Sequence, residues 1–324
     1  MKLKVTVLSV LVILASLPAQ AKTLNMGTGS TKGNYYSMGM DIKSYCSGSI
    51  GVDLNIAETT GSVTNLMGLM DKDYSLGIVQ EDVLNYNAKR NPKKVNQNRM
   101  KVLTGLHEEA VHLLIPKGYN PKSSHDTSMW SKWGSMLGGD EQPHQFELSM
   151  LKGQEVGSWG GSIVSAEALG YFFGLNIHVT EVKNKGDVND TSKPLILVGG
   201  APYQVVQDYL ASGKWTLAAL NYDAISQQAS FYSKQNVNYQ ISGKVRSVPT
   251  VAVRALLIGK SFRKDSRNKP MTELATCIYN NVADLADDPD TNPNWGSVYD
   301  YIEGNGQTNW SYFPLDEAKL DSND

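Results

Sequence analysis

The sequence has no large excess of charge of either sign. Its 324 residues include 30 Lys and Arg against 32 Asp and Glu, so the formal net charge is −2. A protein that neutralises a nucleic-acid backbone needs clustered positive charge. We therefore expect no nucleic acid among the partners of this protein.

Long apolar runs are also missing, except at the N-terminus. The chain opens with Lys2 and Lys4, an apolar stretch from Val5 to Leu17, and the small-residue triplet Ala19-Gln20-Ala21. This layout is typical of a secretory signal peptide, and the stretch is too short to span a membrane comfortably. We expect residues 1–21 to be a signal peptide that is cleaved near Ala21, which leaves an exported, periplasmic protein.

Cysteine is nearly absent, because the chain contains only Cys46 and Cys277. In an exported protein two cysteines are a candidate disulfide. Two separate buried thiols are the alternative, since the spacing does not show whether the side chains meet. If the bond forms, both ends of the mature chain lie in one domain.

Motifs for metal binding and catalysis are missing as well. His107 and His112 are five residues apart, whereas a zinc-binding helix needs a spacing of four, and the run "LHEEAVHL" resembles a strand more than a helix. The segment "GSWGGS", which contains Ser158 and Ser162, lacks the G-x-S-x-G pattern of a hydrolase. We expect no metal, no cofactor and no enzymatic activity.

The sequence does contain strands and helices in alternation. The first part of the chain predicts strands at 22–29, 51–58 and 74–80, helices at 35–46 and 81–90, and a turn followed by a helix at 59–73. Two strand-like runs follow at 99–118, and after the long polar stretch 119–145 the alternation restarts with strands at 153–159, 176–182, 193–200 and 214–221. Such alternation requires a parallel sheet with helices on its faces. We expect two similar α/β lobes, with the polar stretch as an insertion, a lid or a domain edge.

Glycine-rich turns join the first two strands to their helices. The first, "GTGSTKG" from Gly27 to Gly33, has the spacing of neither a dinucleotide fingerprint nor a P-loop. Glycines at a helix N-terminus still favour an anion, through close backbone N–H groups and the helix dipole. The second turn, "TTGS", lies at the carboxyl end of the neighbouring strand, where open α/β sheets bind ligands. We expect Tyr35 to face this ligand, and Tyr36, Met40 and Ile42 to face the core.

Several motifs together resemble the TAXI subtype of TRAP-transporter solute receptors. The N-terminal pair, "GTGSTKGNYYSMGMDI" and "TTGSVTNLMGLMDKDYSLGIVQEDVL", is the most specific part. The later stretches "LKGQEVGSWGGSIVSAEAL", "LILVGGAPYQVV" and "VRSVPTVAVRALLIGK" agree with the family in order and spacing. The resemblance implies an α/β fold of the type II periplasmic-binding-protein class, with two α/β domains around a ligand cleft.

The resemblance also implies boundaries and a ligand. Domain I would comprise residues 22–112 and 215–324, including the C-terminal helices, and domain II residues 113–214, so Cys46 and Cys277 would share domain I. The family captures small organic anions, such as dicarboxylates or glutamate, and a monomeric receptor delivers them to TRAP membrane permease subunits. The implied ligand-facing residues are Gly29, Ser30, Thr31, Tyr35, Thr60, Ser62, Asn65, Gln80, Asp82, Ser158, Gly161, Ser162, Ala201 and Pro202.

Other functions are also compatible with the sequence. The same fold can present its ligand to a sensor kinase or an ABC permease. An exported hydrolase would use Ser158, Ser162 or His112, and a structural envelope protein would carry a vestigial cleft. No arginine is visibly placed to clamp a carboxylate, so Arg246 and Arg254 are candidates only if the fold brings them inward.

Overall fold

The computed structural model describes residues 22–119 and 145–320. The predicted signal peptide and nearly all of the polar stretch 119–145 lie outside these residues. Within the described part of the chain, no helix combines the length and the apolar composition that crossing a membrane requires.

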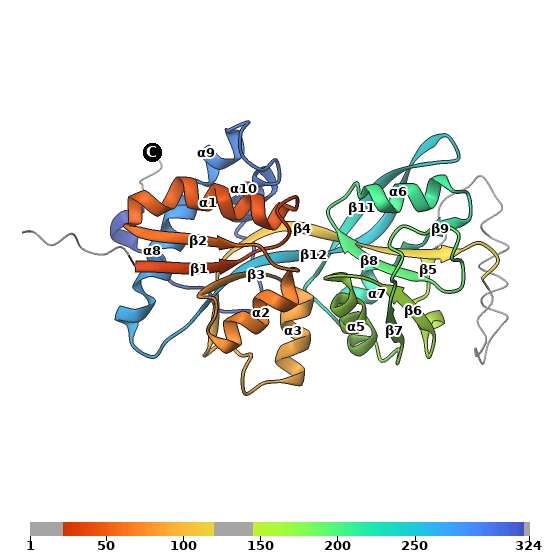
Figure 1. Cartoon of the computed structure of the whole chain (residues 1–324), viewed down its shortest axis with the longest axis horizontal. Helices are drawn as coiled ribbons and strands as arrows, with labels where there is room; N and C mark the ends of the chain where they lie inside the picture. The colour runs from red at the N-terminus through yellow and green to blue at the C-terminus, as the bar shows by residue number, and fades with distance from the viewer. Residues whose placement is uncertain (1–21, 120–144, 321–324) are drawn as a thin grey trace, which may run out of the picture.

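Two lobes lie side by side along the longest axis of the molecule, and two long strands join them (Figure 1). The joining strands are β4 (Met100–Pro116) and β12 (Lys244–Lys260). The first lobe contains β1 (Lys22–Gly27), α1 (Asn34–Ile50), β2 (Val52–Ala57), α2 (Ser62–Asp71), β3 (Leu76–Gln80), α3 (Glu81–Arg90), α8 (Asp265–Asn280), α9 (Val282–Asp287) and α10 (Trp295–Glu303). The second lobe contains β5 (Gln145–Phe146), β6 (Glu155–Ser158), α5 (Ser162–Phe172), β7 (His178–Glu181), β8 (Leu195–Gly199), α6 (Gln204–Ala211), β9 (Trp215–Leu217), β10 (Ala219–Leu220), α7 (Tyr222–Ser226) and β11 (Tyr232–Ile241).

The lobes share one strand order. In the first lobe the order is β2-β1-β3-β12-β4, and in the second it is β7-β6-β8-β4-β9. The first three strands of each set are parallel to one another, and the next strand, which arrives from the other lobe, is antiparallel to them. This confirms the predicted mixed α/β fold of the type II periplasmic-binding-protein class.

The apolar clusters show where the chain passes between the lobes. Leu106 and Ala255 pack in the core of the first lobe, whereas Val111 and Val253 pack in the core of the second. The crossings therefore lie near residues 107–109 of β4 and at Arg254 of β12. Residues between 215 and 253 pack with the second lobe, so the packing favours a later return than the predicted boundary at 215. The domain boundaries themselves stay a proposal.

Some local predictions were wrong. The buried face of α1 contains Tyr35, Met38 and Ile42, whereas Met40 is 43% exposed and Tyr36 is only half-buried. The helical period places residues three and four positions apart on one face, and the face that starts at Tyr35 is the one that meets the sheet. The two strand-like runs at 99–118 form the single strand β4, and the predicted strand at 214–221 is interrupted between β9 and β10.

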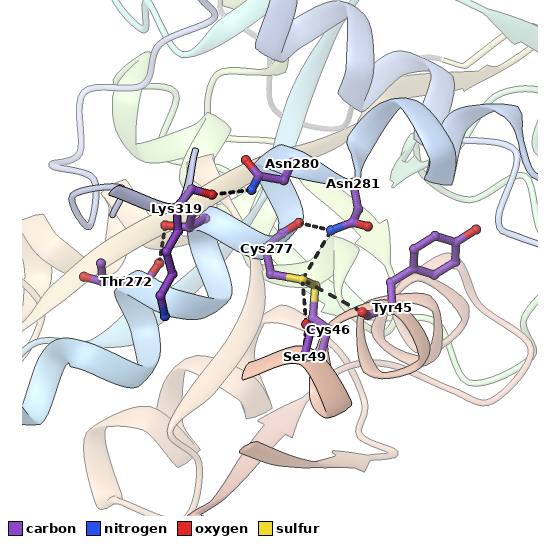
Figure 2. The surroundings of a disulfide bond; sticks show 9 residues. Tyr45, Cys46, Ser49, Thr272, Cys277, Asn280, Asn281 and Lys319 are labelled. Carbon is purple, nitrogen blue, oxygen red and sulfur yellow. Dashed lines mark hydrogen bonds between the residues drawn. A yellow bond between two sulfur atoms is a disulfide. The ribbon is translucent and has the colours of Figure 1, made fainter. Parts of the chain in front are cut away.

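The two cysteines form a disulfide that ties α1 to α8. Cys46 and Cys277 are bonded with their Cα atoms 5.8 Å apart, and both are buried in the main apolar cluster of the first lobe. Figure 2 shows Asn281 beside the bond, where its side-chain amide donates to the Cys277 carbonyl at 2.7 Å. The pairing that the sequence left open is thus settled, and it joins the two ends of the described chain within one lobe.

Candidate functional site

Polar residues interrupt strand β4 at the point where it crosses between the lobes. His107, Glu108 and Glu109 lie between two apolar runs of the strand, where the chain passes from the core of the first lobe to the core of the second. Glu108 pairs with Arg254 on the neighbouring strand, with Oε1 and Nη2 2.9 Å apart. Polar side chains of the crossing segment are therefore available to contact both lobes.

Glu109 gathers hydrogen-bond donors from the first lobe. The Tyr35 hydroxyl on α1 donates to Oε2 at 3.1 Å, and the Gln80 side-chain amide donates to the same oxygen at 2.5 Å. Burial, with a contribution from the Glu109 charge, raises the pKa of Tyr35 well above its ordinary value. Tyr35 is thus held as a neutral donor, and the carboxylate of Glu109 is held in one position.

Gln80, at the end of β3, connects side chains from both lobes. Ser62 at the start of α2 donates to Gln80 Oε1 at 3.3 Å, and its own oxygen accepts from the Gln80 backbone N–H at 3.0 Å. Ser165 on α5, which belongs to the second lobe, donates to the same Oε1 at 3.3 Å. A single side chain therefore links α2, β4 and the opposite lobe.

Asp82 in the first turn of α3 is fully buried between the lobes. Its Oδ1 accepts from the Val83 backbone N–H at 2.7 Å, and Oδ2 accepts from the hydroxyl of Tyr232, a second-lobe residue, at 3.4 Å. Burial raises the pKa of Asp82 to about 6, and the charge of Glu109 adds to that increase. We call the place where Gln80, Asp82 and Glu109 meet Ser165 and Tyr232 the junction. It holds two carboxyl groups, Asp82 from the first lobe and Glu109 from the crossing strand.

The second lobe approaches this junction through the turn before α6. A side chain built on Gly200 would place its first carbon 3.4 Å from Asn34 Nδ2, so the turn lies against the N-terminus of α1. Burial raises the pKa of Tyr203, and the Glu109 charge contributes to the increase. Ala201 and Pro202, predicted to contact ligand, are exposed on the same turn.

Three polar residues predicted to face the ligand are instead bonded to backbone. Asn65 donates to the carbonyls of Thr28 and Ile78, at 2.6 and 2.7 Å, and accepts from Thr59. Ser158 donates to the Ile196 carbonyl, and Ser162 exchanges hydrogen bonds with the backbone of Val198. These side chains fasten turns to neighbouring strands, which the turn sequences did not indicate.

The remaining predicted residues lie in the turns before α1, α2 and α5. Gly29 is buried, and its carbonyl accepts from Thr59, whereas Ser30, Thr31 and Thr60 are exposed. The Thr31 backbone N–H donates to the Glu58 carboxylate at 3.3 Å, so a protein anion already occupies part of the predicted anion turn. Gly161, just before α5, is half-buried.

The hydrolase alternative finds no support in the described residues. Ser158 and Ser162 are bonded to carbonyls of β8, while His112 Nε2 lies 2.8 Å from the Tyr239 hydroxyl. Burial lowers the pKa of His112 to about 4, so this ring is neutral and packed among aromatic residues. Histidine and serine are not assembled for nucleophilic catalysis here.

The arginines considered as carboxylate clamps do not lie at the junction. Arg254 has its guanidinium 4.1 Å from the centre of the Tyr301 ring, beside Glu108 and the Leu106 carbonyl. Arg246 lies opposite Tyr239 in the β11–β12 hairpin of the second lobe. In the described parts of the chain, no group of three His, Cys, Asp or Glu side chains could hold a metal.

A cavity of about 470 Å³ lies elsewhere in the first lobe. Its wall is formed by α10 and the residues that follow it, and it includes Tyr301, Trp310, Tyr312 and Phe313. None of the predicted ligand-facing residues lines it. Its size is typical of small-molecule sites, but the polar side chains that converge from both lobes are at Gln80.

Sequence reasoning missed Glu109, Ser165, Tyr203 and Tyr232. A usable signal existed for Glu109, because two glutamates and a histidine break an otherwise apolar strand. The same segment was considered above only for zinc binding, through His107 and His112. Ser165 and Tyr232 carry no comparable signal, since their partners lie 85 and 150 residues away in the sequence.

Comparison with known proteins adds a family match and several structural similarities. The model of the NMT1-like family matches residues 26–129, about a third of the chain. The structure is similar to a protein from Bordetella bronchiseptica RB50, with 13% identity, 93% of this chain and 87% of that chain covered, and a TM-score of 0.47. It is also similar to the GluR0 ligand-binding core from Nostoc punctiforme in complex with L-glutamate. The identity is 15%, 86% of this chain and 97% of that chain are covered, and the TM-score is 0.41.

A third similarity is to the sulfonate-binding protein SsuA from Methylobacillus flagellatus KT, described as the periplasmic component of an ABC transporter. The identity is 12%, 91% of this chain and 75% of that chain are covered, and the TM-score is 0.43. All three scores lie below 0.5. The assignment to the type II periplasmic-binding-protein class therefore rests on the strand order and on the two crossing strands of this chain.

Proposed function

We propose that the protein is an extracytoplasmic solute-binding receptor that captures a small organic acid between its lobes. The observation that carries the proposal is the junction at Gln80, where Ser62 of the first lobe and Ser165 of the second donate to one side-chain oxygen. A ligand placed here would contact both lobes. Dicarboxylates and acidic amino acids such as glutamate are the ligand classes that the sequence resemblance favours.

Closure of the lobes is the proposed working motion. A ligand shifts the equilibrium between an open and a closed state toward closure only if it binds the closed state better. It must therefore contact side chains that only closure brings together. Gln80 with Ser165 and Asp82 with Tyr232 are such pairs, because each joins the two lobes. The hinge would consist of the short segments at residues 107–109 and at Arg254, where changes in backbone dihedral angles would let the lobes rotate. No bond is made or broken, so no catalytic group is required.

Delivery to TRAP membrane permease subunits is the proposed downstream step, with a monomeric receptor in the periplasm. The Cys46–Cys277 disulfide suits an oxidising compartment. Presentation of the ligand to a sensor kinase or an ABC permease is the alternative. Genes for a fused TRAP permease next to the gene for this protein would favour the first partner.

Isothermal titration calorimetry tests the receptor function. The purified protein is titrated with succinate, glutarate, L-aspartate and L-glutamate, and its folding is confirmed by circular dichroism. We expect saturable binding of at least one of them with one site per chain. A folded protein that gives no heat with these or with a wider panel of organic acids would contradict the proposal.

A further inference from the structure

Glu109 is a carboxylate with only neutral donors around it. Tyr35 and Gln80 both donate to Oε2, and no Lys or Arg among the described residues forms an ion pair with either oxygen. Its side chain is 14% exposed, so water reaches it poorly. A carboxylate taken out of water is costly unless a positive charge or several donors compensate it.

His107 provides a second, independent observation at the same place. Its side chain is only 1% exposed, and neither ring nitrogen has a hydrogen-bond partner among the described residues. Nε2 lies 3.6 Å from Glu109 Oε1, too far for a good hydrogen bond, and the ring is packed edge-on against Tyr35. Buried polar groups are nearly always satisfied, so an unpartnered nitrogen aimed at this carboxylate indicates that a partner is missing from the site.

The groups expected to bind an anion are partly used by the protein itself. The Thr31 N–H donates to Glu58, and the hydroxyls of Ser158 and Ser162 donate to backbone carbonyls. Arg254 is paired with Glu108. Among the described residues, no Lys or Arg forms an ion pair with Glu109 or Asp82, so a dicarboxylate without an amino group would be repelled by these two carboxyl groups.

We propose that Glu109 pairs with a positively charged amino group of the ligand, so that the site selects amino acids over the corresponding acids without an amino group. The proposal rests on the receptor function proposed above and names its ligand class. An ammonium group has three donors and no acceptor, which suits Glu109 Oε1, the oxygen that Tyr35 and Gln80 leave open. The carboxylate of the same ligand is then left for the glycine turn and the Gln80 region.

The test compares acids that differ only in the amino group. Titration calorimetry measures L-glutamate against glutarate, L-aspartate against succinate, L-leucine against 4-methylpentanoate and L-phenylalanine against 3-phenylpropionate. For the pair that binds, we expect the amino acid to bind about tenfold more tightly or better, the range of a charge-assisted hydrogen bond. In Glu109→Gln this preference should fall close to one.

Glu273→Gln is the matched control, because it makes the same change at a first-lobe carboxylate that pairs with Lys319 and belongs neither to the junction nor to the proposed hinge. We expect it to keep the wild-type preference. The ratio of two affinities is the informative readout, since a merely structural defect would weaken both members of a pair alike. Thermal unfolding confirms that each variant is folded.

Equal or tighter binding of the acid without the amino group would overturn the inference and leave the receptor function standing. An unchanged preference in Glu109→Gln would also overturn it. A thermal shift caused by CaCl2 alone and lost in Glu109→Gln would replace the amino group by a metal ion. Absence of binding by every compound would overturn the receptor function and the inference together.

Discussion

At the scale of single residues, Asp82 gives the sharpest consequence for pH. Burial raises its pKa to about 6, from an ordinary value near 3.8. The folded state therefore binds a proton more tightly than the unfolded state does. The contribution of Asp82 to stability is fully present when it is protonated in both states, below about pH 4, and is lost as the pH rises through 6.

We expect Asp82→Asn to gain stability relative to wild type as the pH rises. The difference in the free energy of unfolding between variant and wild type should move in favour of the variant by up to about 3 kcal/mol between pH 4 and 7.5. Urea unfolding at the two pH values measures it. His112, whose pKa is lowered to about 4 by burial, makes stability rise with pH between about 4 and 6.5, but it does so in both proteins and cancels in the difference. A difference that does not change with pH would contradict the account.

Individual side chains were the least predictable part of the site. Tyr35 and Tyr36 are neighbours in a helix, and the prediction that Tyr36 faces the core was wrong, because Tyr35 is the buried one and meets Glu109 and Ser62. The prediction that Tyr35 faces a ligand stays a prediction. Asn65 follows a glycine turn, as a ligand-binding residue would, yet its side-chain amide donates to two backbone carbonyls. Such choices depend on partners that only the folded chain brings near, and local sequence does not encode them.

At the scale of elements, the local pattern was highly informative in the first lobe. Helix α3 occupies the predicted residues 81–90, because a buried strand directly precedes an amphipathic segment that starts with Glu81 and Asp82 and ends with Lys89 and Arg90. Strand β11 was not predicted. Its run "YSKQNVNYQI" is largely polar because one face is exposed, and it is held in place by pairing with β12 along its whole length.

The disulfide between α1 and α8 should matter for stability more than for binding. It closes a loop between residues 231 apart in the sequence, and the chain-entropy model assigns about 5 kcal/mol to loops of this length. We expect the double substitution Cys46→Ser and Cys277→Ser to lower the free energy of unfolding by about 2–5 kcal/mol. Guanidinium unfolding measures this change.

Ligand affinity provides the internal control for that experiment. Both cysteines are buried in the first lobe, and Cys46 lies about three helical turns along α1 from Tyr35, so the folded double variant should bind its ligand as wild type does. Unchanged stability, or an affinity that falls while the fold persists, would show that the bond has a different role.

At the scale of the whole molecule, two lobes with the same strand order exchange one strand each. β4 and β12 pair with each other and connect the strands of both lobes into one 10-stranded sheet, so the lobes are joined through two short segments (Figure 1). Polar residues lie in these segments, at 107–109 and at Arg254. The sequence predicted two α/β lobes from alternation alone. It also placed the return to the first lobe at residue 215, a boundary that stays a proposal, whereas β9 and β10, just after that residue, pair with β4 and β5.

Every functional proposal made above places the ligand between the lobes. A crystal structure of the protein grown with L-glutamate tests this claim most directly. We predict ligand density in contact with Glu109 and Gln80 on one side and with second-lobe residues near Ser165 or Tyr203 on the other. Density in the 470 Å³ cavity beside Tyr301 and Trp310, with the junction at Gln80 empty, would contradict it.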